Sequence, residues 1–249
     1  MTAPQQMITP QGRRIAYHQT PGAGPGVVFL GGFRSDMSGT KALYLQDWAT
    51  RTGRAFMRFD YSGHGQSGGD FRDGCIGDWL EDAQAVLGLT AGPQVLVGSS
   101  MGGWVALLLA RVVPLAGLVG IAAAPDFTED SMWAGFSDVQ RAELLAGQVA
   151  LPSEYADDPY VITRRLIEDG RNHLVMRAPL DLPFPVRLLQ GTADVDVPME
   201  RALRLLDHVS GPDIRLALVK DADHRFSTGP CLAMIVAAVK DILKGDADA

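Results

Sequence analysis

A serine flanked by glycines lies between a run of strand-forming residues and a helix-forming segment. The run is QVLV (94–97) and the segment that follows reads GGWVALLLARV. Between them, Gly98-Ser99-Ser100-Met101-Gly102 matches the pattern G-x-S-x-G. In this setting the pattern predicts a sharp strand-to-helix turn that projects a serine hydroxyl from the edge of a sheet. Only Ser100 has glycine two residues away on both sides, so Ser100 is the candidate nucleophile and Ser99 is not.

Strand-like and helix-like segments alternate along the chain. Apolar runs predict strands at 27–32, 55–60, 94–98, 115–121, 186–191 and 214–219, and helical patterns cover 41–52, 76–89, 101–112, 199–209 and 228–243. Apolar strands separated by helices indicate a mostly parallel sheet with helices on both faces. In such a sheet, ligands bind at the carboxyl ends of the strands.

One segment, residues 126–181, interrupts this alternation. It contains helical patches and no clear strand, so we interpret it as a helical lid inserted into a single domain that spans residues 1–249. Its apolar residues either line an acyl pocket or pack the lid onto the body, and we name Trp133 as the candidate for substrate contact. These apolar residues are Met132, Trp133, Phe136, Leu144 and Leu145.

Composition narrows the possible partners and location. Lys plus Arg is 22 and Asp plus Glu is 29, giving a net charge of −7 without a basic patch, which argues against nucleic acid. The most apolar stretch, 104–125, contains Arg111 and Pro114, so it fits a buried helix and strand better than a membrane span. No signal peptide is evident, and Cys75 and Cys231 are expected to be inert thiols. These features predict a cytoplasmic protein acting on a small-molecule or acylated substrate, and they leave the oligomeric state open.

A serine nucleophile needs a base and a group that orients the base. Of the five histidines, His224 follows the last strand-like run and comes after Ser100 in the chain. Asp194 lies between them, just after the run 186–191. The order Ser, Asp, His is that of a hydrolase triad on this kind of sheet, so Ser100, Asp194 and His224 are the predicted catalytic residues. Asp196 and Asp126 remain alternatives for the acid.

A developing oxyanion needs backbone N–H donors. We expect one from Met101, directly after the nucleophile, and one from Phe33 in the loop after the first apolar run. Gly32 would let the backbone approach the substrate closely. Arg34 either contacts a carboxylate on the substrate or holds its loop. His64, in the turn-rich segment 60–67, is expected to hold a turn.

No cofactor or metal is expected. The sequence has no Cys/His cluster with zinc-ligand spacing, and no G-x-G-x-x-G follows a first strand.

Taken in order, the motifs GGFRSDMSGTKA, RFDYSGHGQSGG, VGSSMGGW, QGTADVDVP and DADHRF resemble the α/β-hydrolase superfamily over nearly the whole chain. They are most similar to the family of α/β hydrolase domain-containing protein ten, described as a palmitoyl-protein thioesterase and acyl-glucuronide esterase. The resemblance implies an α/β-hydrolase fold, and it implies Ser100, Asp194 and His224 as the triad.

The expected function is therefore a serine hydrolase that cleaves carboxylic esters or thioesters through an acyl-enzyme. Two alternatives are a hydrolase-fold ligand-binding protein without catalysis and a serine peptidase. The complete set Ser100, Asp194 and His224 argues against the first. Nothing in the sequence resembles the extra domain or large lid often attached for peptide substrates, which argues against the second.

Overall fold

The computed structural model describes residues 3–151 and 160–245. In this part of the chain, an eight-stranded sheet has the order β1-β2-β4-β3-β5-β6-β10-β12. The strands from β4 to β12 are mutually parallel, whereas β1 and β2 are antiparallel to their neighbours. The bounds are β1 Gln5–Ile8, β2 Arg14–Thr20, β3 Ala23–Leu30, β4 Arg54–Phe59, β5 Gln94–Ser99, β6 Leu115–Ile121, β10 Val186–Gly191 and β12 Ile214–Val219.

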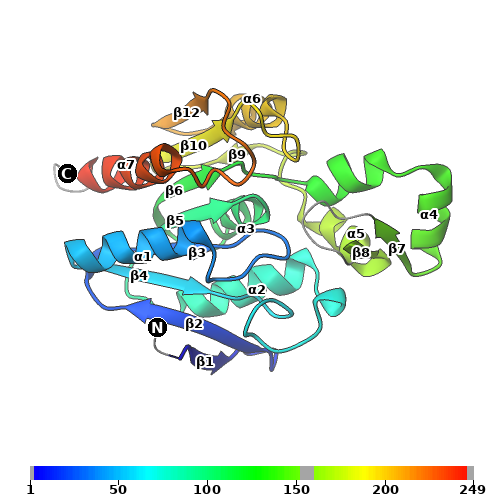
Figure 1. The fold of residues 1–249 in the computed structure, drawn as a ribbon, viewed down its shortest axis with the longest axis horizontal. Helices are drawn as coiled ribbons and strands as arrows, with labels where there is room; N and C mark the ends of the chain where they lie inside the picture. The colour runs from blue at the N-terminus through cyan, green and yellow to red at the C-terminus, as the bar shows by residue number, and fades with distance from the viewer. Residues whose placement is uncertain (1–2, 152–159, 246–249) are drawn as a thin grey trace.

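Five long helices cover the two faces of the sheet, and they fall where the periodicity predicts helices (Figure 1). They are α1 Thr40–Thr52, α2 Ile76–Leu87, α3 Met101–Leu109, α6 Met199–His208 and α7 Gly229–Gly245. α1 and α7 pack on one face, and α2, α3 and α6 pack on the other. No helix in the described ranges has both the length and the hydrophobicity to cross a bilayer.

The central strands are apolar along their whole length because both of their faces are covered. In β3, Val28 and Leu30 join the core beneath α2 and α3, whereas Val27 and Phe29 join the core beneath α1 and α7. Successive side chains of a strand point to opposite faces, so one apolar run supplies both cores. The edge strands β1 and β2 were not predicted, because their polar and partly exposed residues break any apolar run.

Within the predicted lid, 126–181, the described residues 138–151 and 160–170 project to one side of the sheet (Figure 1). The prediction that it has no strand is wrong, because β7 and β8 pair antiparallel and β9 pairs with β11. These strands have only two to four residues each, too few for an apolar pattern to be evident. The elements here are the π-helix η2 Thr128–Trp133, α4 Asp138–Leu145, β7 Gln148–Leu151, β8 Tyr160–Thr163, α5 Arg164–Gly170, the 3-10 turn η3 Arg171–His173 and β9 Leu180–Asp181; η1 Phe71–Asp73 and β11 Val209–Ser210 lie outside the lid.

Candidate active site

Ser100 occupies the turn between β5 and α3, with φ 53° and ψ −117°. A positive φ is strained for a residue with a side chain, and such strain is typical of functional turns. The chain folds back so tightly that a Cβ on Gly98 would lie 2.3 Å from the carbonyl oxygen of Gly102. The Ser100 N–H donates to the carbonyl of Ile121 at 2.9 Å, which ties the turn to β6. The local sequence therefore requires small residues on both sides of the serine, as the motif predicts.

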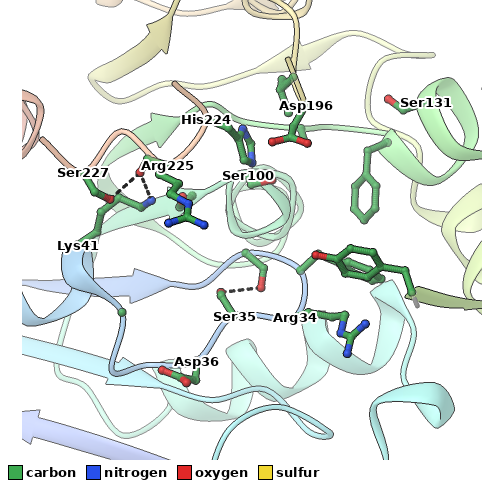
Figure 2. Close-up of a pocket in the computed structure, with 18 of the residues that line it drawn as sticks. Arg34, Ser35, Asp36, Lys41, Ser100, Ser131, Asp196, His224, Arg225 and Ser227 are labelled. Carbon is green, nitrogen blue, oxygen red and sulfur yellow. Dashed lines mark hydrogen bonds between the residues drawn. The ribbon is translucent and has the colours of Figure 1, made fainter. Parts of the chain in front are cut away.

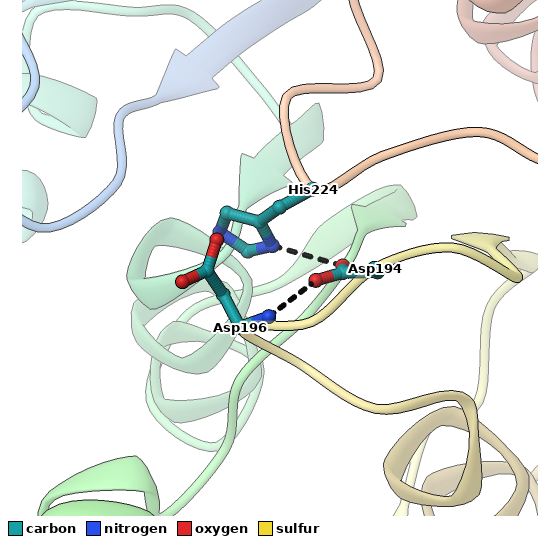
Figure 3. A group of neighbouring side chains, drawn as sticks. All are labelled: Asp194, Asp196 and His224. Carbon is teal, nitrogen blue, oxygen red and sulfur yellow. Dashed lines mark hydrogen bonds and ion pairs between the residues drawn. The ribbon is translucent and has the colours of Figure 1, made fainter. Parts of the chain in front are cut away.

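Asp194 and His224 come from the loops that follow β10 and β12, and they meet at the carboxyl edge of the sheet. Nδ1 of His224 lies 2.9 Å from Oδ2 of Asp194 (Figure 3). The other oxygen of Asp194 accepts the N–H groups of Asp196 and Val197 at 3.0 and 2.8 Å. The side-chain amide of Gln190 donates to Oδ2 at 3.0 Å. The carboxylate is thus held rigidly, and it orients the imidazole.

Burial by itself would raise the pKa of Asp194, which is 6% exposed. The hydrogen bond from His224, its electrostatic attraction for the carboxylate and the Val197 N–H outweigh burial, so the pKa of Asp194 lies below its usual value. Asp194 is therefore a carboxylate at neutral pH and accepts the Nδ1 proton. This leaves Nε2, the other ring nitrogen, to act as a base.

Ser100 and His224 line the same pocket, and Figure 2 shows the imidazole above the serine. Within the described residues, no hydrogen bond yet joins the Ser100 hydroxyl to the ring. In enzymes without substrate, such bonds are often long and tighten only when substrate binds. The structure thus brings the three predicted residues together at one edge of the sheet, with Asp194 behind the ring and Ser100 in front of it.

Asp196 and Asp126, the two alternatives for the acid, do not occupy the position that Asp194 takes beside Nδ1 of His224. Asp196 lines the pocket beside the ring, but it contacts Asp194 through its backbone N–H, which donates a hydrogen bond, and not through its carboxylate (Figure 3). Asp126 is fully buried, and its oxygens accept the N–H groups of Val175 and Met176 at 2.8 and 3.0 Å. Its carboxylate therefore anchors the segment that leads out of the lid.

Three side chains of this site lie close enough together to be considered as metal ligands. One ligand atom each from Asp194, Asp196 and His224 lies within 4.8 Å of the others. However, the Asp194 oxygens and Nδ1 of His224 are already hydrogen-bonded. The donor set therefore fits an oriented base better than a cation site.

The predicted oxyanion donors flank Ser100. Gly32 and Phe33 line the pocket, and a Cβ on Gly32 would lie 3.5 Å from the Cβ of Ser100. Met101 is the first residue of α3, where backbone N–H groups have no partner within the helix. Among the backbone hydrogen bonds of turns, loops and caps in residues 3–151 and 160–245, none is donated by the N–H of Phe33 or of Met101. Both are thus available to an incoming oxygen.

The pocket has a volume of about 520 Å³ and two chemically different sides. The lid side is mostly apolar, although the guanidinium of Arg34 lies over its Tyr160, and the opposite side carries cations. Phe127, Met132, Leu151 and Ile162 line the first side, and Lys41 and Arg225 line the second.

Lys41 was not singled out from the sequence. It is the second residue of α1, and its ammonium group donates to the carbonyl of Arg225, next to His224. Burial lowers the pKa of Lys41 to about 8, although the charges of Asp223 and Asp194 act in the opposite direction. A lone lysine in a helical pattern carries no signal in the sequence, because only the tertiary fold places it beside the base.

The prediction that Trp133 contacts substrate is corrected, because Trp133 is not among the described residues that line the pocket. The guanidinium groups of Arg171 and Arg141 lie over its ring, 4.7 and 5.3 Å from the centroid. These cation–π contacts hold the indole within the lid. Met132, one residue earlier, takes the pocket position instead. Arg34 does line the pocket, with its guanidinium 4.7 Å from the ring centroid of Tyr160.

The parallel sheet, the strained serine turn and the Asp194–His224 pair define a hydrolase of the α/β class. The model of the alpha/beta hydrolase family matches residues 27–233, which is most of the chain. The chain therefore belongs to the alpha/beta hydrolase family, and it is a hydrolase.

The chain is also similar to curated proteins from several mammals that share the same name. The chain is 34% identical over 233 residues to the rat palmitoyl-protein thioesterase ABHD10, mitochondrial, and this alignment covers 92% of the chain and 78% of the relative. It is 32% identical to the human protein of the same name, covering 92% of the chain and 76% of the relative.

Solved structures agree with these relationships. A putative hydrolase from Agrobacterium vitis S4 superposes with a TM-score of 0.93 at 44% identity, over 96% of this chain and 98% of that one. The mouse alpha/beta hydrolase domain-containing protein 10 gives a TM-score of 0.88 at 31% identity, over 98% and 99%. The predicted α/β-hydrolase fold and the family resemblance are thus confirmed.

Proposed function

We propose that the protein is a serine hydrolase that cleaves carboxylic esters or thioesters through an acyl-enzyme formed on Ser100. The observation that carries this proposal is the 2.9 Å contact between Nδ1 of His224 and Asp194, behind a ring that shares a pocket with Ser100. An oriented neutral imidazole is the base that a serine hydroxyl needs.

The chemistry follows from this arrangement. Nε2 of His224 takes the Ser100 proton as the oxygen attacks the acyl carbon, and the Asp194 carboxylate stabilises the resulting imidazolium. The N–H groups of Phe33 and Met101 bind the oxyanion of the tetrahedral intermediate. The imidazolium then protonates the leaving alcohol or thiol, and the acyl group stays on Ser100. Water, deprotonated by His224, completes the cycle by hydrolysing the acyl-enzyme.

The apolar lid side of the pocket suits an acyl chain. Four apolar residues line it, and an apolar surface of this kind recognises hydrocarbon mainly by removing it from water. The curated relatives are named palmitoyl-protein thioesterases, so a long-chain S-acyl group is one candidate substrate. An acyl glucuronide is another, and it rests only on the family resemblance of the sequence motifs. Among esters and thioesters, we favour substrates with an apolar acyl group, and experiment must identify the alcohol or thiol that is released.

A fluorophosphonate probe tests the proposed nucleophile. The wild-type protein should be labelled on Ser100 and should hydrolyse p-nitrophenyl esters, and Ser100→Ala should lose both properties while it remains folded. Ser99→Ala is the matched control, since it removes the neighbouring hydroxyl of the same turn, and it should still be labelled. Labelling that disappears in Ser99→Ala and persists in Ser100→Ala would overturn the assignment.

Two other outcomes would favour the alternatives. A folded wild-type chain that is not labelled would indicate a ligand-binding protein without catalysis. Turnover of peptides at rates above those of esters would indicate a peptidase. An acyl-length series measured with both oxygen esters and thioesters would then define the substrate class.

Location is a separate proposal. The sequence predicts a cytoplasmic protein, whereas the curated relatives are named mitochondrial. Fractionation of source cells with an antibody against the full chain would decide between the two.

A further inference from the structure

His64 is a buried histidine that lies outside the predicted triad. It is 4% exposed and sits in the loop between β4 and η1. Its ring packs edge to face against Phe71 and Trp79, with centroids 5.0 and 5.1 Å away. An imidazole enclosed by aromatic rings still has two polar nitrogens, and each needs a partner.

Each ring nitrogen of His64 faces a group that can either only accept or only donate a hydrogen bond. Nδ1 lies 3.1 Å from the carbonyl oxygen of Ser62, which can only accept a hydrogen bond. The backbone N–H of Arg34, which can only donate, points to Nε2 at 3.3 Å. Only the neutral ring with its proton on Nδ1 satisfies both contacts. The two neighbours therefore determine the tautomer.

The second contact reaches the oxyanion loop. Arg34 directly follows Phe33, whose N–H is the proposed oxyanion donor, and both residues line the pocket. We propose that His64 is a positioning residue for catalysis: its unprotonated Nε2 holds the Arg34 N–H and thereby fixes the Phe33 N–H toward the substrate oxygen. This inference rests on the proposed function, because it assigns His64 a part in that reaction.

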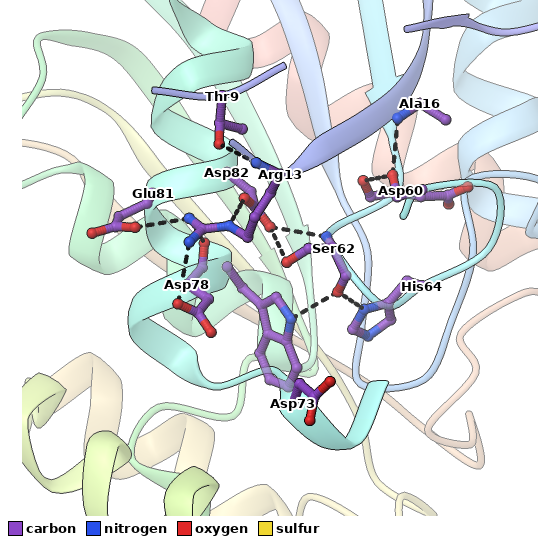
Figure 4. Close-up of polar contacts among 12 residues, drawn as sticks. Thr9, Arg13, Ala16, Asp60, Ser62, His64, Asp73, Asp78, Glu81 and Asp82 are labelled. Carbon is purple, nitrogen blue, oxygen red and sulfur yellow. Dashed lines mark hydrogen bonds and ion pairs between the residues drawn. The ribbon is translucent and has the colours of Figure 1, made fainter. Parts of the chain in front are cut away.

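The anchor behind His64 is rigid (Figure 4). The N–H and hydroxyl of Ser62 donate to one oxygen of Asp82 at 2.9 and 2.6 Å, and Nε of Arg13 donates to the other at 2.7 Å. The indole N–H of Trp79 donates to the same Ser62 carbonyl at 3.1 Å. Asp82 is fully buried. A chain of hydrogen bonds thus runs from α2 through Ser62 and His64 to the oxyanion loop.

The electrostatic surroundings favour the neutral ring. Burial, opposed by the Ser62 carbonyl and reinforced by the charge of Arg34, lowers the pKa of His64 to about 4. At neutral pH the ring therefore keeps an unprotonated nitrogen that can accept the Arg34 N–H. Because the group that His64 positions is a donor to the oxyanion, which forms only in the transition state, loss of His64 should weaken binding of the transition state more than binding of the substrate.

Three substitutions separate positioning from packing. His64→Phe keeps the aromatic volume and removes both polar contacts. His64→Gln retains a carbonyl oxygen that can reach the Arg34 N–H. His64→Asn carries an amide that can reach Ser62 but is too short to reach Arg34 as well. Wild type and variants are compared by thermal unfolding, by kcat and KM for a p-nitrophenyl ester, and by inhibition with a trifluoromethyl ketone, which forms an oxyanion on the serine.

We expect His64→Phe and His64→Asn to lose roughly 10- to 100-fold in kcat with little change in KM, somewhat less than deletion of an oxyanion donor costs. Their affinity for the ketone should fall by a similar factor, and His64→Gln should recover most of both losses. Unchanged kcat and ketone affinity in either folded variant would overturn the proposal. So would a His64→Gln variant as impaired as His64→Asn.

A measurement on the wild-type protein does not depend on the folding of any variant. Long-range proton–nitrogen NMR reports which ring nitrogen of His64 carries the proton, and His64→Gln identifies the signal. We expect the proton on Nδ1 across neutral pH, and a proton on Nε2 would overturn the proposal. If the wild-type protein hydrolyses no ester, the proposed function fails, whereas the NMR result still tests the contact with Arg34.

Discussion

A Cβ atom on Gly102 would lie 2.2 Å from the carbonyl oxygen of Leu30 and 2.6 Å from that of Gly31. The first turn of α3 therefore sits directly on the end of β3, where the oxyanion loop begins. Leu30 pairs with Gly98 of β5, so the nucleophile turn and the loop that carries Phe33 are built against each other. The distance between Ser100 and the oxyanion donors is thus fixed by a backbone contact that only glycine permits.

Gly102→Ala should lower both stability and activity. The added methyl would meet backbone atoms, which cannot rotate away, so β3 and α3 must separate. Overpacking of this kind costs about 1–3 kcal/mol in the free energy of unfolding. Urea denaturation and ester turnover measure the two effects. Gly135→Ala is the matched control, because a Cβ there meets nothing within 4 Å, and it should behave as wild type. A Gly102→Ala variant of wild-type stability and kcat would contradict this account of the turn.

Asp194→Asn should reduce kcat by roughly 10³- to 10⁴-fold with the fold retained, since an amide facing Nδ1 favours the wrong tautomer of His224. The measurement is kcat for a p-nitrophenyl ester. Asp196→Asn should cost much less, because the Asp196 N–H that binds Asp194 is unchanged by the substitution. A larger loss in Asp196→Asn would make Asp196 the acid.

Stability in acid should depend on Asp194. Its pKa is lowered in the folded protein, mainly because the His224 hydrogen bond overcomes the effect of burial, whereas an unfolded Asp titrates near pH 3.9. The stabilisation is therefore complete above about pH 4 to 5 and is lost as pH falls through the lower, folded pKa. Urea denaturation of wild type and Asp194→Asn between pH 3 and pH 6 should show a difference in the free energy of unfolding that shrinks toward pH 3. A difference independent of pH would show that the pKa is not lowered.

Asp126→Asn should loosen the lid rather than abolish the chemistry. Asp126 has φ 57°, which asparagine tolerates, so the substitution mainly removes one acceptor. One of the two N–H groups of Val175 and Met176 would then be buried without a partner, at a cost of about 1–3 kcal/mol. Thermal unfolding and kcat are compared with those of Asp194→Asn. If Asp126→Asn kept its stability and lost kcat as Asp194→Asn does, Asp126 would be the acid.

Met132→Trp should shorten the apolar side of the pocket. Met132 lines that side and is only partly buried, so a larger ring can extend into the pocket. Each methylene that is no longer buried costs about 0.8 kcal/mol, so kcat/KM for a hexadecanoyl ester should fall roughly 10-fold or more relative to an acetyl ester. Leu145→Trp, at a lid position that is 54% exposed, is the control and should leave the ratio unchanged. An unchanged ratio in Met132→Trp would place the acyl chain elsewhere.

The sequence by itself determined the central sheet, the five long helices and the serine turn. Each of these follows from local chemistry: continuous apolar runs, helical periodicity, and glycines around Ser100. The antiparallel edge and the short lid strands were not predictable, because partly exposed or four-residue strands leave no apolar pattern.

Only the tertiary structure decided which side chains meet. Three aspartates follow strands, namely Asp194, Asp196 and Asp126. The sequence cannot tell which of their carboxylates reaches Nδ1 of His224, because that depends on the conformation of the loops that carry them. In the same way, Trp133 and Met132 are neighbours on the lid, and only the tertiary structure shows that Met132 lines the pocket while Trp133 packs against Arg171 and Arg141. Lys41 reaches the pocket from a helix distant in the chain, where no local pattern marks it. His64 was expected from the sequence only to hold a turn, and only the tertiary fold brings it to the Arg34 N–H of the oxyanion loop.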